Sequence, residues 1–258
     1  MGLAPLWRLR APPAAGTEAT EATEAAEAAE ATEAAEAAGP AAAEPAQWSP
    51  DPPPSAAPDV PPAGPRTAAI AEMDWPALAA AVAGCTACGL CRERKQAVLG
   101  VGDPRADWLF VGEGPGAEED ARGEPFVGQA GRLLDSMLAA IGLRRGEDVY
   151  IANAVKCRPP GNRTPEPGET AACWPYLSRQ VDLIRPRLIV ALGRPAAQTL
   201  LNTEVKIGAA RGRLFDHRGI PLIVTYHPAY LLRNLADKAL AWEDLVFMRR
   251  TMRGLKAS

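Results

Sequence analysis

The fold is decided by the stretch Trp108-Leu109-Phe110-Val111-Gly112-Glu113-Gly114-Pro115-Gly116-Ala117-Glu118-Glu119-Asp120. Its first four residues are apolar, which predicts a short buried strand. Three glycines and one proline then force a sharp turn, and three carboxylates follow within the next four positions. Glycine lets a backbone approach a ligand closely, and α/β folds gather their ligands at the carboxyl ends of strands. The loop is therefore a candidate ligand-binding loop, although such glycines can also simply turn the chain.

Outward from this strand, apolar strand patterns alternate with helical patterns. Extended segments are predicted at residues 108–111, 149–155, 188–192, 213–216 and 221–225, the last two joined by the turn His217-Arg218-Gly219. Helices are predicted at residues 75–82, 131–141, 169–184, 195–201 and 235–252, with Asp74 as the N-cap of the first. This alternation predicts an α/β fold whose mostly parallel sheet is covered by helices on both faces.

The first 66 of the 258 residues differ from the rest in composition. They carry ten acidic residues against three arginines, a charge of −7, which leaves 25 bases and 21 acids, or +4, for residues 67–258. Residues 17–38 contain only Ala, Glu and Thr, and residues 40–65 hold ten prolines. Neither pattern forms an apolar stripe, so we expect a disordered tail that acts as a tether or binds a partner. The mildly basic domain at residues 67–258 suits a polyanionic partner.

The sequence pattern argues against a membrane-spanning helix and against a secretory signal. No apolar run approaches the roughly 18 residues that a membrane-spanning helix needs. The basic residues near the start follow its short apolar patch instead of preceding it, which argues against a secretory signal. We therefore expect a soluble cytoplasmic protein without a membrane partner, and a monomer.

Five cysteines, an odd number, argue against a disulfide framework in such a protein. Cys85 and Cys88 are separated by two residues, so their thiolates can converge on one centre. Cys157 follows a predicted strand, and Cys173 lies in the next predicted helix. Four thiolates from two separated pairs fit tetrahedral zinc or a cubane iron–sulfur cluster, and their spacing does not choose between the two. Cys91 is either a spare thiol or an alternative ligand.

The two histidines have different expected environments. His217 lies in the predicted hairpin turn and is expected to be exposed to solvent. His227 follows the apolar strand at residues 221–225, so its imidazole is expected at a strand's carboxyl end, as Glu113 is. The segment after it, with Leu231 and Arg233, is expected to be a loop whose exposed apolar groups wedge into a base stack while a cation holds phosphate.

Four motifs occur in order along the chain: Gly112-Glu113-Gly114-Pro115-Gly116 with Glu119-Asp120, Pro125-Phe126-Val127-Gly128, Asn153-Ala154-Val155-Lys156-Cys157-Arg158-Pro159-Pro160, and His227-Pro228-Ala229-Tyr230-Leu231-Leu232-Arg233. Together they resemble the family 4 uracil-DNA glycosylases, and the resemblance covers roughly residues 78–253. It implies a three-layer fold with a central four-stranded, mostly parallel sheet between helices. It also implies a [4Fe–4S] cluster on Cys85, Cys88, Cys157 and Cys173, which leaves Cys91 out.

The implied reaction hydrolyses the N1–C1′ bond of uracil in single- or double-stranded DNA. Uracil must leave the base stack and enter a pocket, where the resemblance places Phe126 against its face and Asn153 on its edge. The imidazole of His227, neutral or cationic, would donate to uracil O2 as negative charge collects there, with help from the backbone of Glu113 and Gly114.

The remaining expected site residues contact the sugar, the water or the DNA. Catalytic carboxylates are expected from Glu113 and Glu119, without a choice between them, and Asn162 is expected to hold the water. Here the chain departs from the better-known uracil glycosylases, which have an aspartate where this sequence has Gly114. Pro115 completes the substrate loop. Phosphate contacts are expected from Arg158, Arg163 and Lys156, besides Arg233.

Two other functions stay open. One is a non-catalytic iron–sulfur module that binds nucleic acid with the same fold. The other is a relative that captures uracil covalently through a histidine-containing basic insertion, but the corresponding loop at residues 156–167 has no histidine.

Overall fold

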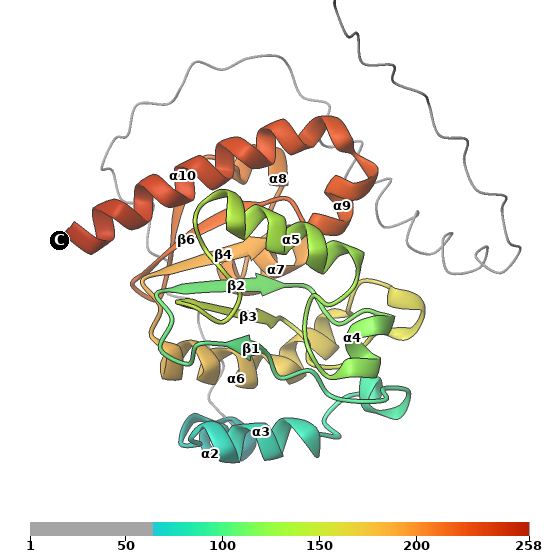
Figure 1. Cartoon of the computed structure of the whole chain (residues 1–258). Coiled ribbons are helices and arrows are strands. Elements are labelled where there is room, and N and C mark those ends of the chain that lie inside the picture. Colours follow the sequence, from blue (N-terminus) through green and yellow to red (C-terminus); the bar gives the residue numbers. More distant parts are fainter. Residues whose placement is uncertain (1–63, 258) are drawn as a thin grey trace, which may run out of the picture.

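The computed structural model describes residues 64–257, so the predicted disordered tail lies almost entirely outside the described residues. Within them the chain forms a six-stranded sheet between two layers of helices (Figure 1). The strands are β1 (Val101–Gly102), β2 (Trp108–Gly112), β3 (Val149–Asn153), β4 (Leu188–Leu192), β5 (Leu214–His217) and β6 (Ile220–Thr225). Their order across the sheet is β1-β3-β2-β4-β6-β5.

The four inner strands are parallel, and the two edge strands run antiparallel to their neighbours. The α/β class and the four parallel strands are therefore confirmed, whereas the sheet has six strands instead of four. Every residue of β2, β3 and β4 is buried. Burial on both faces explains why these strands are continuous apolar runs in the sequence.

Helices cover both faces of this sheet. Figure 1 shows α5 (Gln129–Ala140) and α10 (Lys238–Ala257) on one side, and α6 (Pro167–Ile184) with α2 (Pro65–Ala71) and α3 (Trp75–Ala83) on the other. The Asp74 side chain caps α3 by accepting from the Ala77 N–H at 3.0 Å, as predicted. Shorter helices are α4 (Ala117–Arg122), α7 (Arg194–Leu201), α8 (Ile207–Ala210) and α9 (Pro228–Arg233), and 3-10 turns occupy Gly89–Arg92, Pro160–Asn162 and Leu235–Asp237.

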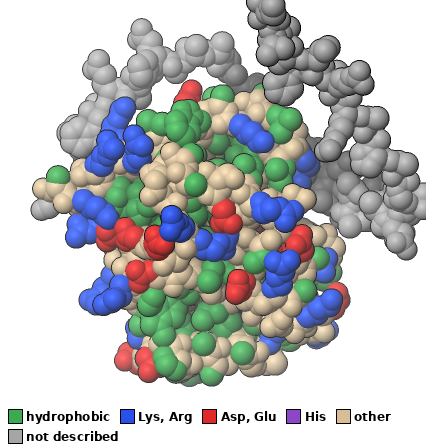
Figure 2. Space-filling view, in the orientation of Figure 1, with side chains coloured by type: hydrophobic (Ala, Val, Ile, Leu, Met, Phe, Trp, Pro, Cys, Tyr) green, Lys and Arg blue, Asp and Glu red, His purple; other side chains and the backbone are tan. Residues whose placement is uncertain are grey.

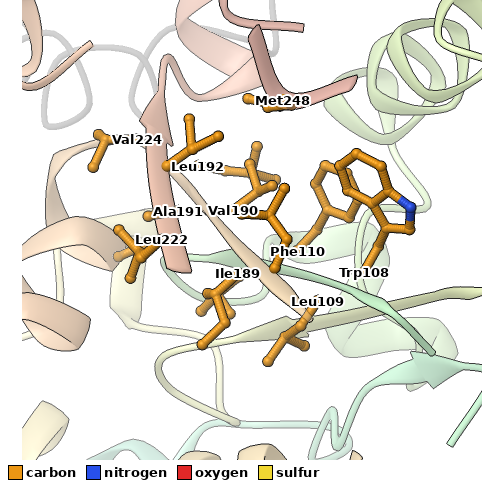
Figure 3. Close-up of a cluster of buried hydrophobic side chains, with 14 of the residues drawn as sticks. Trp108, Leu109, Phe110, Ile189, Val190, Ala191, Leu192, Leu222, Val224 and Met248 are labelled. Carbon is orange, nitrogen blue, oxygen red and sulfur yellow. The ribbon is translucent and has the colours of Figure 1, made fainter. Parts of the chain in front are cut away.

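The main core lies between the sheet and these helices. In Figure 3, Phe110 and Val190 lie on one side of neighbouring strands and Leu109 and Ile189 on the other, with Met248 of α10 packed above the sheet. A second buried cluster lies under α2 and α3 and contains the side chains of Cys157 and Cys173. No helix of the described segment has the length and apolar character required to cross a membrane.

The expected position of His217 is wrong. Positive φ angles at Arg218 (55°) and Gly219 (86°) make these two residues the turn between β5 and β6. His217 consequently belongs to β5, where it is 4% exposed. Its Nδ1 lies 2.7 Å from the Leu200 carbonyl oxygen.

Candidate active site and cysteine site

A cleft of about 290 Å³ opens at the carboxyl ends of the four parallel strands. β3 contributes its last residue, and the segments that follow β2, β3, β4 and β6 contribute the rest, because parallel strands end at the same edge of a sheet. The lining residues are Glu113, Gly114, Pro115, Gly116, Glu119, Phe126, Ala130, Asn153, Pro159, Asn162, Arg163, Thr164, Gly193, Arg194, Pro195, His227, Ala229, Tyr230 and Arg233. The structure thus brings together the substrate and carboxylate residues that the sequence suggested.

Phe126 lies against the end of β2 and faces His227. The two ring centroids are 5.5 Å apart and the planes are tilted by 32°. Phe126 has a φ of 54°, which an L residue rarely adopts, and Arg145 stabilises this turn by donating to its carbonyl at 2.8 Å. A Cβ at Gly112 would lie 2.5 Å from the Phe126 ring and 2.5 Å from the Asn153 Oδ1. Only glycine therefore fits between the aromatic ring and the amide.

Asn153 ends β3 and is 2% exposed. Its Oδ1 has no hydrogen-bond partner among the described residues. Leaving a buried acceptor unpaired costs about 1–3 kcal/mol. Because the side chain lines the cleft, this oxygen is suited to accept a hydrogen bond from a bound ligand.

His227 follows β6 and is the N-cap of α9. Its Nδ1 accepts from the Ala229 N–H at 3.1 Å, which assigns the ring proton to Nε2. Desolvation lowers the pKa of this imidazole to about 4, although the nearby Glu119 opposes the shift. The cleft therefore contains a neutral imidazole whose Nε2–H is a hydrogen-bond donor.

The carboxylate of Glu119 receives three backbone N–H groups. They come from Gly116 at 3.1 Å, Val127 at 2.9 Å and Gly128 at 3.0 Å. This arrangement fixes the glycine loop against the segment that carries Phe126. Glu113 lines the cleft from the same loop, and its carbonyl accepts from the Val155 N–H at 3.1 Å.

The loop after β3 is held by its own arginines. Arg158 donates to the Asn162 Oδ1 at 2.7 Å, which orients the Asn162 amide at the cleft. Arg163 forms two hydrogen bonds to the Glu169 carboxylate, at 2.9 and 2.7 Å. A basic side chain paired in this way orders the loop in addition to any contact with DNA.

Two expectations about the DNA-contacting residues are wrong. Lys156 is 1% exposed and cannot reach a phosphate. Leu231 is also 1% exposed, because the segment expected to be a loop is α9, which turns this side chain into the core. Its neighbour Leu232 is 39% exposed instead and stands beside the exposed Arg233. Basic and acidic side chains are interspersed over the face shown in Figure 2.

The five cysteines line one small cavity, with Cys157 and Cys173 buried and Cys85, Cys88 and Cys91 partly exposed. The structure therefore brings together the four predicted ligands and also Cys91. Within residues 64–257, no three Cys, His, Asp or Glu side chains are arranged around a single metal ion.

Cations and backbone N–H groups surround the sulfur atoms of this cavity. Arg94 donates to Cys157 Sγ at 3.1 Å, and Arg66 lies 3.8 Å from Cys85 Sγ. The Lys156 N–H donates to Cys173 Sγ at 3.2 Å. Burial nevertheless raises the pKa of the Cys173 thiol to about 11, so metal binding would have to displace its proton.

The family model of the uracil DNA glycosylase superfamily matches residues 99–246, which include every cleft residue. The chain belongs to this superfamily. It is 49% identical over 165 residues to the type-4 uracil-DNA glycosylase of Thermotoga maritima, covering 62% of this chain and 85% of the relative. It is 48% identical over 156 residues to the type-4 enzyme of Archaeoglobus fulgidus, covering 57% and 78%. The type-4 enzyme of Pyrobaculum aerophilum is 43% identical over 181 residues, covering 67% and 92%.

Some residues of the cleft were not predicted from the sequence. Gly193 and Arg194 follow β4, so the rule that locates ligands at strand ends could have found them. A Cβ at Gly193 would lie 2.9 Å from the His227 Cβ, and the glycine has a φ of 87°. No sequence pattern indicates that Arg66 and Arg94 contact the cysteines, because only the fold brings these residues together.

Proposed function

We propose that this chain is a uracil-DNA glycosylase of base excision repair. It binds uracil flipped out of DNA and hydrolyses the N1–C1′ bond, which leaves an abasic site and free uracil. One observation carries the proposal: the buried Oδ1 of Asn153, which has no partner within residues 64–257, shares a cleft with an aromatic face and a neutral imidazole donor. The superfamily assignment and the type-4 relatives support it.

The cleft selects uracil through one edge and one face of the base. Asn153 accepts from N3–H with Oδ1 and donates to O4 with its amide nitrogen. Cytosine presents an acceptor at N3 and a donor at C4, which is the reverse pattern. The ring of Phe126 stacks on the base, and the absence of a Cβ at Gly112 leaves room for the ring at this position.

The departure of uracil requires a donor for its developing negative charge. The Nε2–H of His227 donates to O2, where that charge concentrates, and backbone N–H groups of Glu113 and Gly114 assist. The ring is already oriented by its hydrogen bond from Ala229, so little reorganisation accompanies bond breaking.

The sugar becomes oxocarbenium-like, and a water must attack C1′. Glu113 and Asn162 are the groups to which we assign this water, because both line the cleft and Arg158 holds the Asn162 amide. Glu119 is assigned a positioning role, since three backbone N–H groups already share its carboxylate.

We assign a [4Fe–4S] cluster to Cys85, Cys88, Cys157 and Cys173. Four thiols spread around a cavity, with cations and an N–H group at three sulfurs, fit a multi-iron cluster better than one tetrahedral ion. Hydrolysis needs no electron, so we assign the cluster a structural role. When bound, it would join the segments that carry these cysteines. Arg158, Arg163, Arg233 and Leu232 are assigned to DNA around the cleft.

Free uracil should be measured after the full chain is incubated with uracil-containing single- and double-stranded DNA. Release in molar excess over the protein is expected, and the same DNA with thymine in place of uracil should yield no base. Binding without release would favour the non-catalytic nucleic-acid module, and a covalent product would favour the uracil-capturing relative. The cytoplasmic location and the monomeric state stay predictions.

A further inference from the structure

Lys156 is a fully buried amine that the reaction described above does not use. It is among the largest side chains with under 2% exposure. Its Nζ donates to the Asn153 carbonyl oxygen at 2.8 Å and to the Gln180 Oε1 at 2.5 Å. Both hydrogen-bond acceptors of this amine are neutral groups. Burying an amine in this way is costly, so its fixed position calls for an explanation.

The hydrogen bonds continue from Lys156 into the core. Gln180 is 0% exposed, and its Nε2 donates to the Leu99 carbonyl at 2.9 Å and to the Tyr150 hydroxyl at 3.3 Å. Lys156 is therefore held at the far end of a buried polar network anchored on α6 and β3. A network whose members are all paired rigidifies the groups it connects.

The same residue also contacts the cysteine site. Its backbone N–H donates to Cys173 Sγ at 3.2 Å, while its carbonyl accepts from the Val98 N–H at 2.7 Å. Lys156 thus connects the cysteine cavity, through its backbone, with the last residue of β3, through its side chain.

Asn153 needs contacts to its main chain to fix its orientation, because its Oδ1 makes no hydrogen bond among the described residues. Its orientation must come from its main chain and from the packing against Gly112 and Phe126. On one side, the Ala154 N–H donates to the Gly112 carbonyl at 2.8 Å. On the other, Lys156 holds the Asn153 carbonyl.

We propose that Lys156 is a positioning residue for base selection, which fixes Asn153 with its Oδ1 toward N3–H of uracil and ties that orientation to the cysteine site. This inference rests on the proposed function, since it assumes that uracil binds in the cleft. It makes base recognition sensitive to the integrity of the cysteine site, although no cysteine lines the cleft.

The test is Lys156→Met in the full chain, which keeps the length of the side chain and removes its donors. Tyr150→Phe is the matched control, because it removes a hydroxyl from the same buried network without touching Asn153. For each protein the readouts are the inhibition constant of free uracil, KM and kcat on uracil-DNA, the melting temperature, and iron content.

Asn153 contacts the base in both the ground state and the transition state, so losing its orientation should affect binding. We expect Lys156→Met to raise the inhibition constant of uracil and KM by roughly tenfold, the equivalent of one hydrogen bond, with kcat changed less than about threefold. Tyr150→Phe should leave the inhibition constant unchanged at a similar melting temperature. A merely structural role would lower the melting temperature of both variants without separating their uracil affinities.

An unchanged inhibition constant in an iron-loaded Lys156→Met protein would overturn the proposal. If that variant does not fold, Gln180→Leu removes the partner that holds the amine beside the Asn153 carbonyl without touching a cysteine. A rise in the inhibition constant is then required, smaller than for Lys156→Met because the bond to Asn153 can still form. Should wild-type protein release no uracil, the proposed function fails instead, and the two failures are thereby distinguished.

Discussion

Replacing His227 by alanine should reduce kcat on uracil-DNA by roughly 10²–10³-fold. The Nε2–H donates to uracil O2 only as charge develops there, and the loss of one such preorganised donor costs about 2.7–4 kcal/mol. Binding of uracil-DNA should change much less, because the bound base is still neutral. Single-turnover rates and the dissociation constant of the uncleaved complex separate the two effects.

The pH dependence tests the neutral form of His227. Its folded pKa of about 4 lies below the ordinary value of 6.5, so the imidazole is neutral at every pH above about 5. We therefore expect no loss of kcat from this group between pH 5 and pH 8. A cationic donor would instead lose activity about tenfold per pH unit above pH 6.5. A decline of that kind that His227→Ala abolishes would refute the neutral form of the donor. Wild-type turnover in the alanine variant would refute the assignment of His227 as the donor to uracil O2.

The lowered pKa of His227 also affects the stability of the folded protein. Between about pH 6.5 and pH 4 the unfolded chain binds a proton at His227 that the folded chain does not. Because the unfolded state then holds more protons, the free energy of unfolding should fall as the pH falls through this window. Burial lowers the pKa of His217 as well, which acts in the same direction.

Purified protein should contain iron and sulfide in about equal amounts. Cys173→Ala should lose the iron and Cys91→Ala should retain it, whereas stoichiometric zinc in colourless wild-type protein would contradict the assignment. Leu231→Ala should destabilise the protein by about 2–5 kcal/mol in a denaturant titration, because it empties a buried site. Leu232→Ala should change stability by less than about 0.5 kcal/mol but slow uracil release from duplex DNA more than from single strands. A chain that starts at residue 66 should turn over uracil-DNA as fast as the full chain at moderate salt, and a large loss would show that the preceding residues serve catalysis.

The inner strands were predictable because burial on both faces demands continuous apolar runs. The edge strand β1 was not, since two residues, one of them glycine, carry no strand pattern. Its pairing depends on that glycine: a Cβ at Gly102 would lie 2.2 Å from the Val149 carbonyl oxygen. The antiparallel contact with β3 is thus a tertiary effect that no local propensity encodes.

The errors at His217 and Leu231 share a physical cause. A hairpin turn that is one residue shorter than expected moves His217 from the turn into a strand and buries it. A helix of six residues is too short to display a 3.6-residue period, so the sequence predicts a loop where α9 forms. Leu231 and Leu232, adjacent in sequence, consequently point into the core and into solvent respectively.

The sequence offered Glu113 and Glu119 as equivalent carboxylates, and only tertiary geometry separates them. Glu119 is shared among three N–H groups from two segments, so its charge is already used to hold the glycine loop near Phe126. These N–H groups occupy acceptor sites on both carboxylate oxygens, so fewer sites are left to orient a water. Glu113 and Asn162 both line the cleft, which supports the assignment of the hydrolytic water to them. Glu119 holds the glycine loop that carries Glu113, and Arg158 holds Asn162 in the loop after β3.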